Sequence, residues 1–502
     1  MTFLKDLYAS FVIFCSNFNA RFGRLVNWTL LVLAVALVAV FVVRTARLSI
    51  RAKKTERRMT MPPRDEKREQ NLCKLLAAAV QIPTVTGDWE GLDRLYELLK
   101  QRFPRVFGTM RVTRLESGAL LLHWRSPDSA GKKPVLLCAH ADVVPVEGQN
   151  WTTGEPFSGK ISDGFVYGRG ALDCKNVLIG LLSAAEGLLE EGFAPGRDIY
   201  YAFGCDEETG GEQGAKAIAQ ELRHRGLHFE FILDEGSNIT TEHLGAKDFP
   251  AALLGVAEKG AATFRLTARA KAGHAAMPPA HTAVGLLAEA ICRIEAAPMH
   301  KRLLPVMRQC LERSAPAMGL LAQACVANLP ATKHLLYHST RHNLQVAALL
   351  HTTFAVTQAS GAPAANVLPE TAQATVNARI LQGDTGEGVL AYLQALLADL
   401  PVTVEMLSCM EPSPVTPPLG PVYQIITAAV EDTFGRLPCI PTVMPAGTDT
   451  KHYQEFSDHI FRFLPFVTDP QTFSTVHGAD ERIGCQSFAA GVTFYERLLK
   501  KL

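Results

Sequence analysis

Residues 135–145 read Val-Leu-Leu-Cys-Ala-His-Ala-Asp-Val-Val-Pro, an apolar run that ends in His140 and Asp142. Such a run predicts a buried β-strand, and the two-residue period of a strand puts His140 and Asp142 on the same side of its end. Two polar side chains that face one way from the end of a buried strand form a candidate functional site.

Three further segments carry acidic residues in a similar setting. Residues 199–210 and 229–236 are apolar runs that lead into acids, and residues 168–176 form a loop with two glycines before the helical pattern of residues 177–189. Loops at the carboxyl ends of strands are where α/β sheets place their sites, so we expect these acids to meet. They are Asp173, Asp206, Glu207, Glu208 and Asp234.

Imidazole and carboxylate groups together suit divalent ions such as zinc, which bind both at about 2.0–2.2 Å. A pair of ions about 3.5–4 Å apart needs one bridging carboxylate and a second histidine. Asp173 can bridge, and His477 supplies the second imidazole. Because Glu207 and Glu208 are adjacent, one would hold a metal while the other takes a proton from water.

Each segment alone also has an ordinary structural interpretation. Asp173 could cap a helix, and the acids of residues 206–208, which precede Thr-Gly, could form a solvated turn. The joint occurrence of these segments, most of them after a strand pattern, favours a metal site.

These residues also resemble a known family. The patterns around them, with Gly168-Arg-Gly, Asp234-Glu-Gly and His477-Gly, resemble the dizinc aminoacylase and carboxypeptidase family from about Glu69 to the C-terminus. The resemblance implies that Glu207 is the general base and that Asp142 hydrogen-bonds to His140 and fixes its tautomer. It implies two zinc ions, with Asp173 bridging and the full ligand set being His140, Asp173, Glu208, Asp234 and His477. The chain departs from the family pattern at Cys174, Asn176 and Ser237.

Composition excludes some classes of protein. The chain has 502 residues, about half of them apolar, which suggests two packed domains behind a membrane-active leader. The net charge is +1 and no domain is basic, so we expect no nucleic-acid partner. The eleven scattered cysteines do not form a disulfide framework and are best interpreted as small buried hydrophobic residues.

Residues 25–43 form an uncharged apolar run long enough to cross a bilayer as one helix. No clean small-residue cleavage site follows it, which favours a retained single-pass anchor over a secreted protein whose signal peptide is cleaved. The basic cluster of residues 44–58 outweighs the basic residues before the run, so the positive-inside rule points the rest of the chain toward the cytosol. Residues 53–70 are charged and carry two prolines, which predicts a linker.

The expected fold is α/β, with four segments. Residues 1–68 form the membrane segment and linker, and residues 69–258 form the first part of a catalytic domain with a mainly parallel sheet covered by helices. The family resemblance makes residues 259–411 an inserted lid of ferredoxin-like form, through which a homodimer could form, and returns residues 412–502 to the catalytic sheet. The lid is expected to have strands at 263–269, 352–358, 371–380 and 402–407, and helices at 282–296 and 387–398.

Four lid and loop residues match substrate-side positions of the family. The resemblance implies that His274 reaches over the metals, sometimes in a partner subunit, and stabilises the oxyanion, although it could also be a surface turn residue. Arg379 is suited to bidentate capture of a free carboxylate. Asn366 would line the substrate, as would Gly447, although the residues after Gly447 could equally cap a helix.

Residues 298–350 are longer than a connection within the lid requires, and they are apolar at mostly helical spacing. We expect two short helices, which could simply pack on their own domain. A similar insert marks the branch that contains the N-fatty-acyl-amino-acid synthase/hydrolase and fungal carboxypeptidase S, and by that resemblance it would be a wall for an acyl chain.

The sequence therefore predicts a metal-dependent amidohydrolase that cleaves, and in reverse forms, N-fatty-acyl amino acids. A membrane-anchored zinc carboxypeptidase or dipeptidase that acts on peptides is the second enzyme hypothesis, because the ligands are common to both. The third hypothesis is a catalytically inactive, membrane-tethered binding module, which loss of Glu207 or of a ligand would have indicated.

Overall fold

The computed structural model describes residues 13, 30–53, 58–244, 246–339 and 344–502. The chain divides into two compact units, which are described separately. One comprises Met1–Glu56 with Leu311–Ser339, and the other comprises Arg57–Cys310 with Thr340–Leu502.

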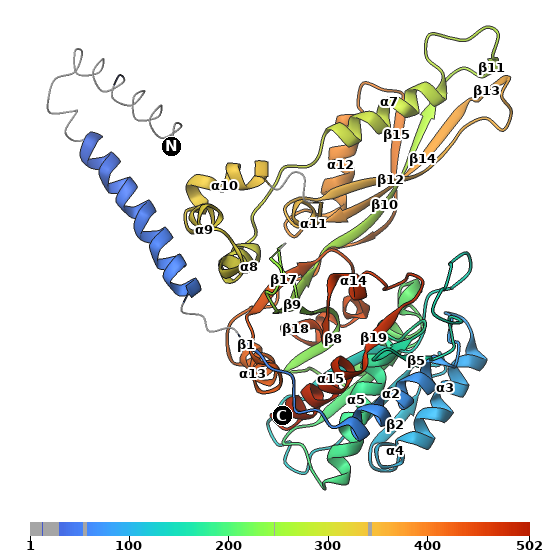
Figure 1. The fold of residues 1–502 in the computed structure, drawn as a ribbon. Coiled ribbons are helices and arrows are strands. Elements are labelled where there is room, and N and C mark those ends of the chain that lie inside the picture. Colours follow the sequence, from blue (N-terminus) through green and yellow to red (C-terminus); the bar gives the residue numbers. More distant parts are fainter. Residues whose placement is uncertain (1–12, 14–29, 54–57, 245, 340–343) are drawn as a thin grey trace. The chain divides into compact units, whose positions relative to one another are not determined.

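The second unit is built on an eight-stranded sheet (Figure 1). Four of its strand pairs, β17 with β9, β18 with β8, β8 with β4 and β4 with β7, are parallel, as predicted. β9 runs antiparallel to β18 and β8, which it meets at a few residues. β4 and β7 are buried along their whole length, because helices cover both faces of a parallel sheet and select continuous apolar runs. An antiparallel edge, formed by β2 and β3, was not predicted. The strands in spatial order are β17 Cys439–Met444, β9 Ala251–Glu258, β18 Ile460–Thr468, β8 Phe231–Thr240, β4 Val135–His140, β7 Ile199–Gly204, β3 Leu120–Trp124 and β2 Arg111–Arg114.

Helices pack against this sheet through apolar faces. α15 (Cys485–Leu499) contacts α2, α5, α13 and β18. It approaches β18 closely because Gly491 has no side chain: a Cβ there would lie 2.2 Å from the ring of Phe466. The other helices around this sheet are α2 Glu66–Val80, α3 Trp89–Arg102, α4 Pro104–Thr109, α5 Lys175–Glu190, α6 Ala215–His224 and α13 Pro421–Phe434.

The predicted linker is wrong in its second half. β1 (Arg58–Met59) pairs with β16 (Gly435–Arg436), and α2 begins at Glu66 behind the N-cap Asp65, whose side chain accepts from the Arg68 N–H. An aspartate followed by acidic residues in the first helical turn indicates the start of a helix. The high charge of the segment, which suggested a linker, is therefore the weaker signal.

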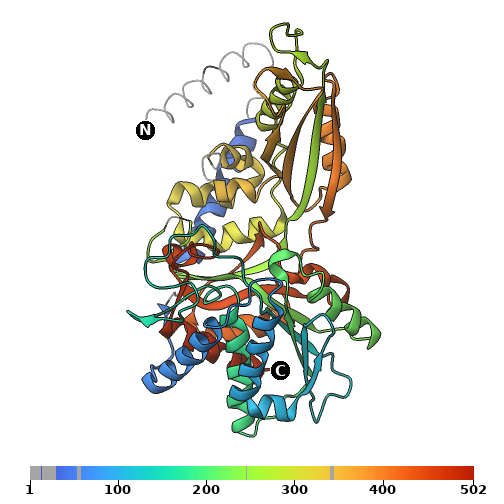
Figure 2. The ribbon, with the colours of Figure 1, turned by 90° about the vertical axis from the view of Figure 1, so that its right-hand side faces the viewer.

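A smaller antiparallel sheet follows in the order β12-β14-β10-β15. Alternate residues of β10 are buried, and they pack against α7 and α12 in one apolar cluster. Figure 2 shows the long strands of this sheet in green and orange. This is the predicted α+β arrangement, and the chain enters it after Glu258 and leaves it after Met410. Its elements are β10 Gly260–Arg269, α7 Ala283–Ala296, β12 Thr353–Ser360, β14 Thr371–Ile380, α12 Gly386–Leu396 and β15 Val402–Met410.

A buried ion pair lies beside the junction of the two sheets. Arg462 Nη2 on β18 is 3.2 Å from Glu258 Oε2 at the end of β9, and both side chains are almost fully buried. Thr450 Oγ1 accepts from the Arg462 guanidinium and donates to Glu258, while Thr448 donates to the other Glu258 oxygen. The pair is therefore fully hydrogen-bonded, which a buried charge requires.

Replacing Glu258 with alanine should lower the free energy of unfolding by about 3–5 kcal/mol, because Arg462 would remain buried without its counter-charge. Urea denaturation of the purified protein measures this. The exposed pair Arg265–Glu405, at 3.4 Å, is the matched control, and Glu405→Ala should cost about 1 kcal/mol or less. Equal losses for the two variants would contradict the expectation.

The first unit contains the helix Leu30–Lys53, called the N-terminal helix below. By its length of 24 residues and its mean hydropathy of 2.3 it could cross a membrane. The first five residues of the expected span, 25–29, lie outside the described residues.

The insert was expected to form two short helices, and that number is wrong. Its described residues form four α-helices and one 3-10 turn, because the helices end and begin at Gly319 and Asn328, where apolar spacing alone indicates a continuous run. These elements are α8 Pro305–Ser314, η2 Ala315–Ala317, α9 Leu320–Ala327, α10 Leu329–Ser339 and α11 Leu344–Ala348.

Candidate metal centre

The expected metal ligands come from five separate segments of the second unit. His140 is the last residue of β4, and Asp173 lies in the loop before α5. Glu208 is in the 3-10 turn η1 (Glu207–Thr209), directly after β7. Asp234 lies within β8 rather than at its end, at a bulge where the pairing with β18 skips two residues, and His477 follows α14 (Pro470–Phe473).

Asp173 lies between two histidines. Its Oδ1 is 3.0 Å from His140 Nε2, and its Oδ2 is 3.0 Å from His477 Nε2. Glu208 Oε2 is 3.2 Å from the same nitrogen of His477. One carboxylate that presents one oxygen to each of two imidazoles has the arrangement that a bridging ligand between two cations needs.

Electrostatics follow from this arrangement. Although burial alone would raise it, the hydrogen bonds from His140 and His477 lower the pKa of Asp173. The same contacts with Asp173 and Glu208 raise the pKa of His477 to about 10. His477 also has a φ of 59°, a conformation that non-glycine residues rarely adopt and that clusters at functional sites.

Unpaired acid oxygens support a cation at this place. Among the described residues, Glu208 Oε1 and Asp234 Oδ2 are buried and have no hydrogen-bond partner. Burial raises the pKa of Asp234 to about 6, since the charged form lacks compensation. Divalent cations would satisfy both oxygens, so the residues present fit a metal centre.

Cys174 contributes a thiol to the same place. Its sulfur, a nitrogen of His140 and an oxygen of Asp173 all lie within 4.8 Å of one another. Burial raises the pKa of Cys174 well above its ordinary value. Metals bind the thiolate, so burial disfavours Cys174 as a ligand.

Asp142 contacts His140 in two ways. Its backbone carbonyl oxygen is 3.0 Å from His140 Nδ1, and its carboxylate oxygen Oδ1 is 3.4 Å away. The carbonyl is therefore the closer acceptor. The carboxylate accepts instead from the backbone N–H groups of Glu207 and Glu208 and from the hydroxyl of Thr86, so it also holds the turn that carries the two glutamates.

Two positioning residues were missed by the sequence analysis. Glu481 is fully buried and accepts from the backbone N–H groups of Leu172 and Asp173, which fixes the loop of the central acid. Arg169 donates to Glu481 from the same loop. The Gly-Arg-Gly motif gave a signal for Arg169, whereas nothing local to Glu481 indicates a partner about 300 residues away.

Glu207 stands beside the cluster. Burial, reinforced by the carboxylates of Asp173 and Glu208, raises the pKa of Glu207 to about 8. Asp449, after β17, is a further buried acid whose pKa is raised by burial, with Glu207 adding to the effect. A cation would lower both values, because an opposite charge favours the ionised form.

The lid residues His274 and Asn366 come together at one end of the smaller sheet. His274 lies in β11 (Gly273–His274), which pairs with β13 (Val367–Leu368), and the Asn366 carbonyl accepts from the Ala275 N–H. Both side chains are exposed, and His274 Nδ1 accepts from the Ala276 N–H. In the described part of the chain, His274 is not among the residues grouped around Asp173.

Arg379 and Gly447 line one pocket of about 340 Å³ between the two sheets of the second unit. Lys451, Met410 and Thr263 also line it. The structure thus joins two of the expected substrate-side residues from segments 68 positions apart. Thr448 caps the turn η3 (Asp449–His452), so this loop has the cap that was the alternative interpretation.

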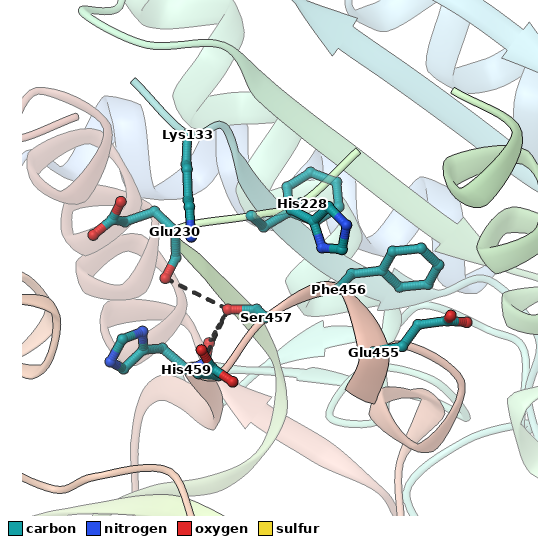
Figure 3. Close-up of a pocket in the computed structure, with 9 residues that line it drawn as sticks. Lys133, His228, Glu230, Glu455, Phe456, Ser457 and His459 are labelled. Carbon is teal, nitrogen blue, oxygen red and sulfur yellow. Dashed lines mark hydrogen bonds between the residues drawn. The ribbon is translucent and has the colours of Figure 1, made fainter. Parts of the chain in front are cut away.

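A separate pocket of about 170 Å³ lies at the amino ends of the strands of the large sheet (Figure 3). Lys133, Glu230 and His459 line it, and each lies one or two residues before the start of β4, β8 or β18. His140 and Glu208 lie at or just after the carboxyl ends of β4 and β7, so this pocket at the amino ends of the strands is not part of the same site. In it, the Ser457 hydroxyl has two alternative acceptors, the carbonyl oxygens of Glu230 at 3.5 Å and His459 at 3.3 Å.

Comparisons with known proteins agree with this geometry. The family model described as "Peptidase family M20/M25/M40" matches residues 136–501. The N-fatty-acyl-amino acid synthase/hydrolase PM20D1 of Xenopus tropicalis is 32% identical over 482 residues, 93% of each chain, and the probable carboxypeptidase S-like 2 of Dictyostelium discoideum is 33% identical over 86% of this chain and 84% of its own. The crystal structure of the metallo-carboxypeptidase Sso-CP2 from Sulfolobus solfataricus shares the fold, with a TM-score of 0.63 at 18% identity, and covers 87% of this chain and 99% of its own.

The predicted resemblance is confirmed by these matches, which extend over most of the chain and include both kinds of protein in the named branch. The fold, the cluster around Asp173 and the relatives agree on one class of protein. This chain belongs to the M20/M25/M40 peptidase family and is a metal-dependent hydrolase.

Proposed function

We propose that this protein hydrolyses, and in reverse forms, the amide bond between a fatty acid and an amino acid. The observation that carries the proposal is the similarity to the PM20D1 synthase/hydrolases, at 32% and 35% identity over most of both chains for the frog and Danio rerio proteins. A catalyst speeds both directions, so the cellular direction depends on the concentrations of amide, fatty acid and amino acid.

The proposed cofactor is a pair of zinc ions. The ligands would be His140, Asp173, Glu208, Asp234 and His477, with Asp173 bridging. The ions would polarise the amide carbonyl and lower the pKa of water.

Glu207 is the proposed general base. It would take the proton of the attacking water and pass it to the amine as the amide bond breaks. Its buried position beside Asp173 and Glu208 supports this role, because it places a carboxylate next to the proposed metal ligands.

Arg379 is proposed to bind the free carboxylate of the amino acid, and Gly447 in the same pocket would let the substrate backbone approach. Asn366 and His274 are proposed to complete the site from the lid. His274 is exposed at the lid end, so stabilisation of the oxyanion would require closure of the lid or the lid of a second subunit in a homodimer.

The N-terminal helix is proposed to be a single-pass membrane anchor. Basic residues 44–58 follow its apolar part, which favours a cytosolic location for the rest of the chain. The alternative is a secreted protein whose signal peptide has been removed.

The second candidate function is a carboxypeptidase or dipeptidase activity, which the carboxypeptidase S-like relatives favour. A panel of N-oleoyl amino acids, N-acetyl amino acids and dipeptides, offered to the purified protein with zinc, separates the two. Faster turnover of dipeptides than of every N-acyl amino acid would reject the proposed function.

The same panel tests whether the insert recognises the acyl chain. Each buried methylene contributes about 0.8 kcal/mol, so four more carbons should raise kcat/KM by roughly two orders of magnitude. Met307 and Leu311 are already buried within the insert, so polar substitutions there would damage packing, and the chain-length series in the unmodified protein is the better measurement. Equal cleavage of N-acetyl and N-oleoyl substrates would reject the acyl wall.

A further inference from the structure

Polar contacts join the insert to the N-terminal helix. Asn328 Nδ2, between α9 and α10, is 3.1 Å from Thr45 Oγ1 and 3.3 Å from the carbonyl oxygen of Phe41. In the middle of α9, Ser49 Oγ donates to Gln323 Oε1 at 2.7 Å. α9 therefore runs antiparallel to the N-terminal helix, from the level of Ser49 to the level of Phe41.

Both insert residues are buried, with exposed fractions of 9% for Gln323 and 3% for Asn328. The Gln323 amide nitrogen donates to the carbonyls of Ala315 and Met318, so its Oε1 depends on Ser49 for a partner from the N-terminal helix. Buried amides without partners are costly. The insert is thus built around the N-terminal helix, which argues against removal of that helix.

The contact with the N-terminal helix also indicates how deep Asn328 and the start of α10 lie relative to a membrane. The apolar run of the N-terminal helix ends at Val43, and Arg44 and Arg47 follow. A bilayer-spanning helix has its first charges at the headgroup boundary, and Ser49 lies about 9 Å beyond Val43 at 1.5 Å per residue. Asn328, which contacts Phe41 and Thr45, is therefore at the boundary itself, and α10 begins at the next residue.

The composition of α10 suits that boundary. Leu335 is 56% exposed, and Lys333 and Tyr337, two residues to either side of it, lie on the opposite face of the helix. A helix in a membrane interface turns its apolar face toward the lipid and its basic face toward water, so the Leu335 face is the lipid side.

We propose that residues 315–339 clamp the N-terminal helix where its apolar run ends and lay α10 in the headgroup boundary of a lipid bilayer. The exposed face of α10 contacts lipid, because α10 begins at the level where the apolar run of the N-terminal helix ends. The proposal does not depend on which amide the protein cleaves.

Photo-crosslinking tests the lipid contact. The full chain, with a photoreactive amino acid in place of Leu335, is placed in phosphatidylcholine and phosphatidylserine nanodiscs and analysed for lipid adducts by mass spectrometry. Leu321 is the matched control: it is 85% exposed, but it lies on the Ser49 side of α9, away from the hydrocarbon. We expect at least fivefold more adduct at position 335, and equal labelling would overturn the proposed depth.

Hydrogen exchange tests the clamp in the same nanodiscs. Ser49→Ala removes the hydroxyl that donates to the buried Gln323 Oε1 and keeps the N-terminal helix intact, so amide exchange in α9 and α10 should quicken about fivefold. Val38→Ala, at a position that is 62% exposed on the same helix, should leave it unchanged. Unaltered exchange in Ser49→Ala, or a mature protein whose N-terminus lies beyond Val43, would overturn the clamp, and neither result bears on the substrate panel.

Discussion

Asp173→Ala is expected to empty the metal centre rather than merely slow the reaction. Asp173 presents one oxygen to His140 and the other to His477, so its loss removes the one group that would serve both ions. Elemental analysis of the purified variant should find far less than the two metal equivalents expected of the unmodified protein, and turnover should be undetectable.

A second aspartate–histidine pair provides the control. Asp198 Oδ2 is 2.9 Å from His123 Nε2 in the same unit, outside the metal centre. Asp198→Ala should lose these local hydrogen bonds and keep the full metal content. Two retained equivalents in Asp173→Ala would refute the bridge, and metal loss in both variants would indicate damage to the fold rather than loss of a ligand.

Circular dichroism of the metal-free proteins separates the remaining explanations. Loss of Asp173 leaves His140 and His477 without their shared acceptor, yet Glu481 still binds the backbone of residues 172 and 173. The loop should therefore keep its place, and the spectrum should match that of the unmodified protein.

Much of the catalytic sheet could be predicted from local sequence. The runs that became β4 and β7 are continuous and apolar because helices cover both faces of a parallel sheet, and each leads directly into site residues. The lid strands alternate because only one face is covered, so β14 was placed at its observed bounds of 371–380.

The remaining features depend on contacts between distant segments. The sequence shows that Asp142 stands near His140, but only the fold shows that its carboxylate is directed to the turn of Glu207 and Glu208. The partners of Asn328 lie nearly 290 residues earlier in the chain, and no local pattern connects them. The bulge that places Asp234 inside β8 arises from pairing with β18, which apolar periodicity does not report.

Glu207→Gln is expected to abolish most turnover while both metals and the fold remain. Glutamine has nearly the same shape but cannot accept a proton, and a general base typically contributes about 10² to 10⁴-fold. The rate should be measured together with metal content. Glu212→Gln, in the same loop but exposed and paired with Lys216, should stay within about twofold of the unmodified rate.

Stability gives this prediction a second readout. Burial raises the pKa of Glu207 from 4.5 to about 8, so in the metal-free protein the folded state binds more protons than the unfolded state between these values. The contribution of the Glu207 carboxyl to the free energy of unfolding therefore falls as pH rises from 4.5 to 8. Glutamine does not titrate, so the stability of the Glu207→Gln variant does not fall for this reason. Thermal unfolding of the metal-free proteins at pH 8 should accordingly show Glu207→Gln at least as stable as the unmodified chain. An inactive variant that is also destabilised would point to a structural role for Glu207, and a variant with near-normal turnover would remove it from the mechanism.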